Sequence, residues 1–403
     1  MHLRSLPSRG VLPLLAGLLA IPNCYLLLLL GAAFRGRGSV ADSQDMGIES
    51  ARRFVVLVPA HDEGEGLLPT LAALAGQEFP AQCYTVVVIA DNCADDTAAV
   101  ARRADVIVLE RFDPDRPGKG HALHWALARV GELVPYDSVV IVDADCVASP
   151  NLLGALSAGL RAGNAAVQAN YVVANPEESW SAALRYAAFI GMNTVRPLGK
   201  THLGLSSGLL GTGMALTREL LDEVPWDAFS IVEDAEYHNK LVAAGRKVAF
   251  IADAYVSSSM PASLKGSGTQ QLRWEGGRGV TLRQSAVPLL RAAIRHKDPV
   301  RLNAALEWLV PPQSLLITAQ LAVAGLGLAA RNRVVARVGA LLAAGQVVFV
   351  LGGLLLVGAP RAVYRALLFS PLLIGQKISI YAKLLAGRTP RSFVRTERRQ
   401  AVS

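Results

Sequence analysis

Three long stretches of the chain contain no charged residue: Val11–Phe34, Trp308–Ala330 and Val338–Pro360. A helix needs roughly 20 apolar residues to cross a bilayer, and each stretch is long enough. Only 18% of the residues are charged, whereas an average soluble domain has about 25%. The sequence therefore predicts membrane helices at both ends of the chain.

The first uncharged run follows Arg4 and Arg9, as the apolar core of a cleavable signal peptide would. It is longer than the usual core of such a peptide, and no clear small-x-small cleavage site follows it. We therefore interpret residues 1–35 as an N-terminal transmembrane anchor.

A fourth apolar run, Ala366–Gln376, has about half the length that a span requires. This length favours an interfacial or re-entrant segment, and the alternative is a tilted span whose lysines snorkel to the interface. Residues 308–386 are thus predicted to form a C-terminal membrane region with two or three spans. Residues 281–307 mix apolar side chains with arginines, which favours an amphipathic helix on the membrane surface.

The net charge of +8 comes largely from basic residues beside these runs. They include Arg278, Arg283, Arg291, Arg295, Lys297, Arg301 and the arginines of the tail, residues 387–403. Stacking aromatic residues do not alternate with them, so we expect contact with a lipid bilayer and none with nucleic acid. The four cysteines show no CxxC or disulfide-framework spacing, which is typical of reduced thiols.

Between the membrane segments, short runs rich in valine and isoleucine alternate with helical patterns. The runs are 54–58, 84–90, 106–109 and 138–142. They lack polar alternation, which predicts strands covered on both faces in an open, mostly parallel sheet. We expect residues 36–51 to be a linker and residues 52–280 to be this α/β domain.

Acidic clusters follow three of these strands, in PAHDEGE (59–65), DNCADDT (91–97) and DAD (143–145). Ligands bind beyond the carboxyl ends of strands in such sheets, so the clusters are predicted to share one edge. Asp143 and Asp145 have the i, i+2 spacing that places side chains on one face. Clustered carboxylates repel unless a cation offsets them, so a divalent metal with a phosphate-bearing nucleotide fits the pattern.

Three further motifs follow along the chain: PGKGHAL (117–123), VED (232–234) and QQLRW (270–274). Together with VPAHDE (58–63) and the later acidic clusters, they resemble the family-2 glycosyltransferases with the GT-A fold. Among these, the sequence is similar to the membrane-bound exopolysaccharide, chitin, hyaluronan and cellulose synthases. The resemblance covers roughly residues 52–285. It implies a Rossmann-like mixed, mostly parallel sheet between membrane helices.

The resemblance also implies a role for each motif. Asp234 is the implied general base, and Asp145 is the implied ligand of Mg²⁺ or Mn²⁺. The implied donor-binding residues are Pro59, Glu63, Asp91, Lys119, Asp143 and Arg273. The implied acceptor-binding residues are Glu233, Gln270 and Trp274, with the glycine-rich segment 204–216 on the same side. Asp62 stands where the family usually has asparagine, and we expect little effect because that position acts through the loop backbone.

These motifs predict a membrane-bound inverting glycosyltransferase of polysaccharide biosynthesis. The donor would be a UDP-sugar, carrying glucose or N-acetylglucosamine, and the acceptor a membrane-associated saccharide or a lipid-linked molecule. A single displacement inverts the anomeric centre, so an α-linked donor would give a β-linkage. QxxRW favours processive extension, the small number of spans favours single addition, and both variants stay open. Polysaccharide-export proteins or a second copy of the chain are the expected partners.

A nucleotide-sugar donor implies a multi-pass inner-membrane protein with its α/β domain in the cytosol and its N-terminus outside. The basic tail then lies inside, as the positive-inside rule prefers, whereas Arg331, Arg333 and Arg337 in an outer loop do not fit it.

Two other functions are compatible with parts of the sequence. VVIVDADCV fits the first motif of haloacid-dehalogenase-like phosphatases, with Asp143 as nucleophile, although three strands precede it here. The third hypothesis is a non-catalytic nucleotide-sugar-binding membrane subunit, which would not need Asp234.

Overall fold

A mixed sheet forms the centre of the molecule. The computed structural model describes residues 10–36, 52–260, 286–308 and 310–385. The eight strands have the order β3-β2-β1-β4-β7-β6-β8-β5. They are β1 (Phe54–Ala60), β2 (Tyr84–Asp91), β3 (Ile107–Arg111), β4 (Ser138–Ile141), β5 (Val147–Ala148), β6 (Ala166–Val173), β7 (Met214–Thr217) and β8 (Val248–Ser258). The predicted mostly parallel α/β sheet is confirmed: β1 to β4 pair in parallel, while β7 runs antiparallel between β4 and β6.

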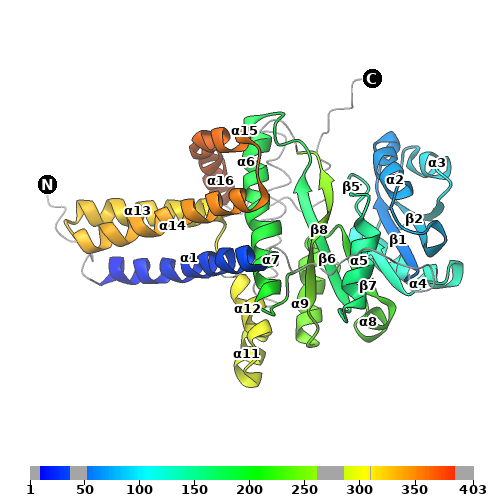
Figure 1. Ribbon diagram of the computed structural model, residues 1–403, viewed down its shortest axis with the longest axis horizontal. Coiled ribbons are helices and arrows are strands. Elements are labelled where there is room, and N and C mark those ends of the chain that lie inside the picture. The colour runs from blue at the N-terminus through cyan, green and yellow to red at the C-terminus, as the bar shows by residue number, and fades with distance from the viewer. Residues whose placement is uncertain (1–9, 37–51, 261–285, 309, 386–403) are drawn as a thin grey trace.

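Helices pack on the sheet (Figure 1). They are α2 (Leu68–Ala75), α3 (Thr97–Arg102), α4 (Lys119–Leu133), α5 (Leu152–Arg161), α8 (Arg218–Glu223) and α9 (Glu233–Ala243). Val56 of β1 belongs to the same buried cluster as Leu71 and Leu156, from α2 and α5. Its neighbour Val55 belongs to a second cluster, with Leu123 of α4. Both faces of the strand are therefore buried, which explains why its sequence lacks polar alternation.

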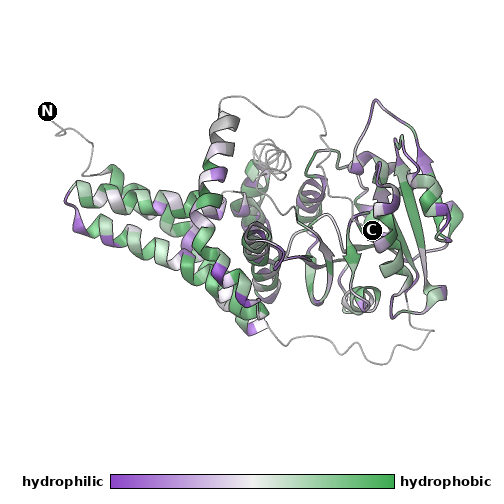
Figure 2. Cartoon of the chain, turned by 90° about the horizontal axis from the view of Figure 1, so that it is seen from above, coloured by the Kyte–Doolittle hydropathy of each residue, from purple (hydrophilic) through white to green (hydrophobic). Residues whose placement is uncertain are grey.

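Three long apolar helices extend side by side away from the sheet: α1 (Val11–Gly36), α13 (Gln313–Ala329) and α14 (Arg333–Val357) (Figure 1). Figure 2 shows that hydrophobic residues predominate along them. Among the described residues, α1 and α14 are long and apolar enough to cross a bilayer, by length and composition. The start of α1 and the α13–α14 turn lie at the same end of this bundle, away from the sheet.

The predicted span at Trp308–Ala330 begins later than expected. Pro312 has an extended backbone (ψ 138°), so α13 starts at Gln313. A helix that started at Trp308 could not run through Pro311, because Pro312 disfavours the helical conformation in the residue before it. The resulting helix has 17 residues, which is about 26 Å at 1.5 Å per residue.

Glycines bring the three bundle helices into close contact. A Cβ atom on Gly327 of α13 would lie 2.6 Å from the backbone nitrogen of Ala336 of α14. Between the same helices and α1, the buried Asn23 accepts hydrogen bonds from the amide nitrogens of Gln346 and Gln320. Tight packing and a shared polar cluster fix how these helices meet.

Six shorter helices lie near the junction of bundle and sheet. They are α6 (Trp180–Phe189), α7 (Arg196–His202), α11 (Val287–His296), α12 (Pro299–Glu307), α15 (Arg361–Ala366) and α16 (Ser370–Leu385). A π-helical turn, Ile190–Val195, joins α6 to α7. The predicted amphipathic segment 281–307 contains α11 and α12, and the fourth apolar run continues through the turn Leu367–Phe369 into α16.

Candidate active site

The three acidic clusters lie at one edge of the sheet, because β1, β2 and β4 are parallel and end there. Pro59 lies in β1 and Glu63 follows that strand. Asp91 is the last residue of β2, and Asp143 and Asp145 follow β4. The edge predicted for ligand binding thus carries the predicted side chains.

Lys119, the first residue of α4, joins three other parts of the chain. Its Nζ lies 2.5 Å from Oδ1 of Asp143 and 3.5 Å from Oε1 of Glu233. It also donates a hydrogen bond of 2.7 Å to the carbonyl of Gly211. Glu233 and Asp234 form the start of α9. The loop after β4, the glycine-rich segment and α9 therefore meet at one ammonium group.

The position of Gly211 requires glycine. Its φ is +84°, a region that other residues rarely adopt. A Cβ atom there would lie 3.4 Å from Nζ of Lys119 and 3.5 Å from Oδ2 of Asp234. The glycine-rich segment 204–216 thus lets the backbone reach Lys119 and Asp234.

Burial and charge shift the pKa values in this cluster. Burial raises the pKa of Glu233 to about 7; Lys119 opposes the shift and Asp234 adds to it. Burial also raises the pKa of Asp234, again against the effect of Lys119. For Lys119, burial alone would lower the pKa, but the charges of Asp143 and Glu233 raise it above its ordinary value. Lys119 is therefore charged, and the two α9 carboxyl groups hold protons more tightly than in water.

Asp143, Asp145 and Cys146 carry ligand atoms within 4.8 Å of one another. The backbone N–H of Asp143 donates a hydrogen bond of 3.0 Å to Oγ1 of Thr212, and its carboxylate is paired with Lys119. Burial raises the pKa of the Cys146 thiol well above its ordinary value, so the sulfur is not a thiolate. The carboxylate oxygens of Asp143 and Asp145 are thus the ligand atoms that suit a hard divalent cation such as Mg²⁺ or Mn²⁺.

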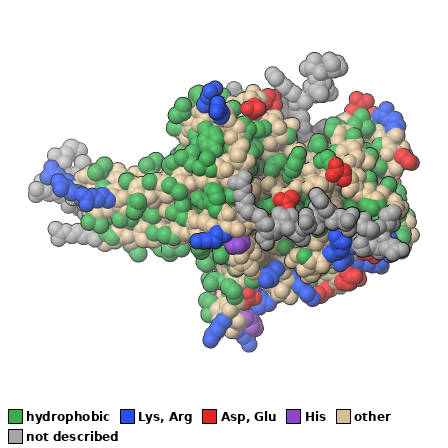
Figure 3. All heavy atoms as spheres, in the orientation of Figure 1, with side chains coloured by type: hydrophobic (Ala, Val, Ile, Leu, Met, Phe, Trp, Pro, Cys, Tyr) green, Lys and Arg blue, Asp and Glu red, His purple; other side chains and the backbone are tan. Residues whose placement is uncertain are grey.

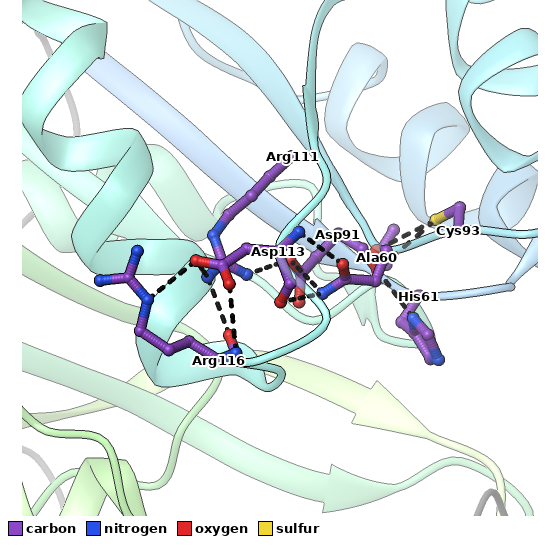
Figure 4. Close-up of polar contacts among 8 residues, drawn as sticks. Ala60, His61, Asp91, Cys93, Arg111, Asp113 and Arg116 are labelled. Carbon is purple, nitrogen blue, oxygen red and sulfur yellow. Dashed lines mark hydrogen bonds and ion pairs between the residues drawn. The ribbon is translucent and has the colours of Figure 1, made fainter.

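Asp91 forms the centre of a second polar network (Figure 4). Its carboxylate is buried and pairs with the buried guanidinium of Arg111 at 2.5 Å. Arg111 also pairs with Asp113 at 3.0 Å and donates to the backbone carbonyl of Arg116 at 2.8 Å. The Asp91 carbonyl lies 2.7 Å from Nδ1 of His61. Arg111 thus connects the end of β2 to the loop that leads into α4.

Asp62 holds the loop after β1. Its φ is +51°, and its Oδ1 accepts a hydrogen bond of 2.7 Å from the N–H of Ala94. Asparagine and aspartate both tolerate this conformation and both offer an oxygen acceptor. The Asp62 side chain itself thus helps to hold the loop, and the small effect expected of this position stays a prediction. The neighbouring N–H of Glu63 donates to Oγ1 of Thr97 at 2.8 Å, which ties the loop to α3.

Gln270, Arg273 and Trp274 lie outside the described residues. The structure adds contacts of Gly211, Thr212 and Arg111 that the motifs did not single out. For Arg111 the sequence offered one indication, because this charged residue follows the apolar run 106–109 almost directly. Gly211 and Thr212 lay within a segment noted only for its glycines.

Comparison with known proteins gives the family. The model of the family "Glycosyltransferase like family 2" matches residues 51–277. A probable glycosyltransferase of Bacillus subtilis, YdaM, is 25% identical over 238 residues, which are 55% of this chain and 54% of that protein. An N-acetylglucosaminyltransferase of Rhizobium meliloti is 27% identical over 254 residues, 59% of this chain and 58% of that protein. The chain thus spans a little over half the length of these curated relatives.

Among solved structures, a mannosyltransferase from Pyrobaculum calidifontis, in complex with GDP-Man and Mn²⁺, shares the fold. Its TM-score is 0.53 at 21% identity, over 84% of this chain and 98% of that one. The family model covers more than half of the sequence, and its matched region contains the whole polar edge described above. This chain belongs to the glycosyltransferase-like family 2.

Proposed function

We propose that this protein is a membrane-bound inverting glycosyltransferase. It transfers a sugar, glucose or N-acetylglucosamine, from a UDP-sugar to a membrane-associated saccharide or lipid-linked acceptor, and forms a β-linkage in polysaccharide biosynthesis. The observation that carries the proposal is the cluster at Lys119, where a strand-end carboxylate meets the two carboxyl groups of α9. Sugar transfer needs both parts: positive charge beside the departing diphosphate and a base beside the acceptor hydroxyl.

On the donor side, Lys119 supplies positive charge for the diphosphate. Asp91, which is paired with Arg111, contacts the nucleoside. Asp143 orients the donor sugar, and Pro59 and Glu63 hold the loop that borders it. Asp145 would hold Mg²⁺ or Mn²⁺, which supplies positive charge for the leaving diphosphate. Arg273 of QxxRW is proposed to add a further cation.

On the acceptor side, Asp234 takes the proton of the attacking hydroxyl. The raised pKa of Asp234 makes the carboxylate a stronger base than a solvated aspartate. Glu233 binds acceptor hydroxyls and increases the basicity of its neighbour through like charge. Gln270 and Trp274 are proposed to line the acceptor channel. One displacement on the donor sugar then inverts the anomeric centre.

The bundle is proposed to attach the enzyme to the inner membrane. α1 and α14 have the length and apolar composition of spans. Many apolar side chains of these helices face outward, including Leu14, Leu18, Ile21, Leu341, Val348 and Leu355. Lipid is the solvent that suits such a surface. The α/β domain is proposed to lie at the cytosolic face, because the proposed donor is a nucleotide sugar.

The test uses full-length protein in nanodiscs with a panel of nucleotide sugars and Mg²⁺ or Mn²⁺. Release of the nucleoside diphosphate is measured for the wild type and for Asp234→Asn. Asp227→Asn, an exposed carboxylate shortly before the same helix, is the matched control. We expect release with one donor, a loss of at least about 10²-fold in Asp234→Asn, and near-normal release in the control.

Product size then separates processive extension from single addition. Absence of binding by every nucleotide sugar would overturn the proposed function. The phosphatase alternative with Asp143 as nucleophile and the non-catalytic subunit are not favoured, because the chain belongs to a glycosyltransferase family.

A further inference from the structure

Helix α11 presents a mixed basic and apolar face to solvent. Val287, Arg291, Ile294 and Arg295 are all exposed, Ile294 to 70%. Their spacing of i, i+4, i+7 and i+8 places them on one side of the helix. The other side is buried through Leu289. One face of α11 therefore packs on the protein, and the described residues do not cover the other face.

The basic charge continues past the end of the helix. Lys297 is exposed and adopts φ +51° at the turn into α12, next to the exposed His296. α11 has no acidic residue in its first turn or elsewhere in its sequence. The next acidic residue, Asp298, accepts hydrogen bonds from the first backbone N–H groups of α12. Figure 3 shows Lys, Arg and His side chains gathered at this tip of the molecule.

The orientation of α11 and α12 matches a surface that lies across the bundle. In Figure 1 both helices run across the direction of α1, α13 and α14. α12 adds two exposed leucines, Leu302 and Leu306. If the bundle crosses a bilayer, helices that run across it lie along the headgroup plane. Exposed leucine and isoleucine beside arginine suit that boundary, where one side is apolar and the other is charged.

The same two helices pack on the helix that carries the proposed base. Leu289 of α11 and Ala304 of α12 share a buried cluster with Val242 of α9. Arg301 donates a hydrogen bond of 2.9 Å to the carbonyl of Ala243, at the C-terminal end of α9. The indole N–H of Trp308 lies 3.3 Å from Oδ1 of Asn239. α11 and α12 therefore pack against α9, whose first turn lies at Lys119.

We propose that the exposed face of α11, through Arg291, Arg295 and Lys297, binds the anionic headgroups of a lipid surface and so fixes α9 relative to the membrane. This inference rests on the proposed membrane attachment and adds the lipid charge that the enzyme selects. Phosphate-bearing headgroups match three exposed cations at a helix whose own sequence contains no acidic residue. Nucleic acid or an acidic protein would match the charge but would leave Val287 and Ile294 in water.

The experiment measures hydrogen–deuterium exchange of peptides covering residues 287–307 in the full chain. The protein is placed in nanodiscs of neutral phosphatidylcholine or of phosphatidylcholine with phosphatidylglycerol. We expect slower exchange of α11 with the anionic lipid, by about fivefold for each charge engaged. The difference should shrink at 1 M salt, where charges more than about 3 Å apart are screened.

The test variant is Arg291→Gln/Arg295→Gln/Lys297→Gln. Its matched control is Arg102→Gln/Arg103→Gln/Arg161→Gln, which removes three exposed cations from the far helices α3 and α5. The test variant should lose the lipid difference and the control should keep it. Equal exchange in both lipids, or a difference that survives in the test variant, would overturn the proposal.

A soluble polyanion added to neutral discs separates lipid from the other partners. Protection of α11 by the polyanion as strong as that from the lipid would reject the lipid assignment in favour of a nucleic acid or acidic protein. The exchange readout does not require sugar transfer. If no nucleotide sugar binds while α11 still distinguishes the lipids, the proposed function fails and the surface assignment stands.

Discussion

At the scale of single residues, the pKa of Glu233 sets how the proposed reaction depends on pH. Burial and Asp234 raise this pKa to about 7, against the opposing charge of Lys119. Protonation of the Glu233–Asp234 pair removes the base, so kcat/KM should fall as the pH drops below about 7, approaching tenfold per unit. Measurement of kcat/KM from pH 5 to pH 9 with a saturating metal checks this.

Glu233→Gln is the matched variant for this profile. It removes the like charge and leaves Asp234 as the titrating group, so the acidic limb should move to lower pH. A limb that stays in place would contradict the assignment to this pair. The pH at which kcat/KM falls therefore reports on the Glu233–Asp234 pair, independently of the maximal value of kcat/KM.

At the scale of elements, Glu307 links α12 to α7. Its carboxylate pairs with Arg196 at 2.5 Å and with Lys200 at 2.7 Å. Burial alone would raise the pKa of Glu307, but the two cations lower it to about 2. Because this pKa lies below the unfolded value of 4.5, the stabilisation is complete above pH 4.5 and is lost as the pH falls towards 2.

Glu307→Gln should therefore destabilise the protein at pH 7 by about 3–5 kcal/mol, because two cations lose their buried partner. The control is Glu223→Gln, which breaks an exposed pair with Arg246 and should cost about 0–1 kcal/mol. Thermal unfolding in detergent at pH 7 measures both. Equal shifts in Tm for the two variants would show that Glu307 does not link the helices.

The α13–α14 contact gives a second prediction for an element. Gly325 and Gly327 lie in the same helix, but a Cβ atom on Gly325 would meet nothing within 4 Å, whereas one on Gly327 would press on Ala336. Gly325→Ala should stabilise by up to about 1 kcal/mol through helix propensity. Gly327→Ala should destabilise, because the α14 backbone must move. The unfolding temperatures of the two variants, compared in one detergent, test the packing.

At the scale of the whole molecule, the proposed topology can be tested by labelling. Arg331 lies at the turn between α13 and α14, at the far end of the bundle, and Arg103 lies on the sheet side. Each is changed to cysteine in a chain whose native cysteines are replaced by alanine. An impermeant maleimide should label Arg331→Cys in intact cells and Arg103→Cys only after permeabilisation. Labelling of Arg103→Cys in intact cells would place the α/β domain outside.

The sequence by itself determined the parts of this protein that depend on local pattern. Valine-rich runs followed by helical periodicity identified β1 to β4 and α2 to α5, because burial on both faces appears directly in the order of side chains. The long runs without a charged residue identified α1 and α14, because a helix that crosses a bilayer needs about 20 apolar residues in a row. The positions of Asp91 at the end of its strand and of Asp143 and Asp145 after theirs followed from the same alternation of strands and helices.

The tertiary structure alone decided which of these local features meet. Lys119 contacts Gly211 and Glu233, which lie about a hundred residues away, because β7 inserts antiparallel beside β4 and carries the glycine-rich segment to the same edge. The periodicity of hydrophobic residues along the sequence does not determine the order of strands that brings these residues together. The pairing of Asp91 with Arg111 likewise depends on β2 and β3 being neighbours. Side-chain order reports burial, whereas convergence of distant residues depends on how strands pair and in which direction they run.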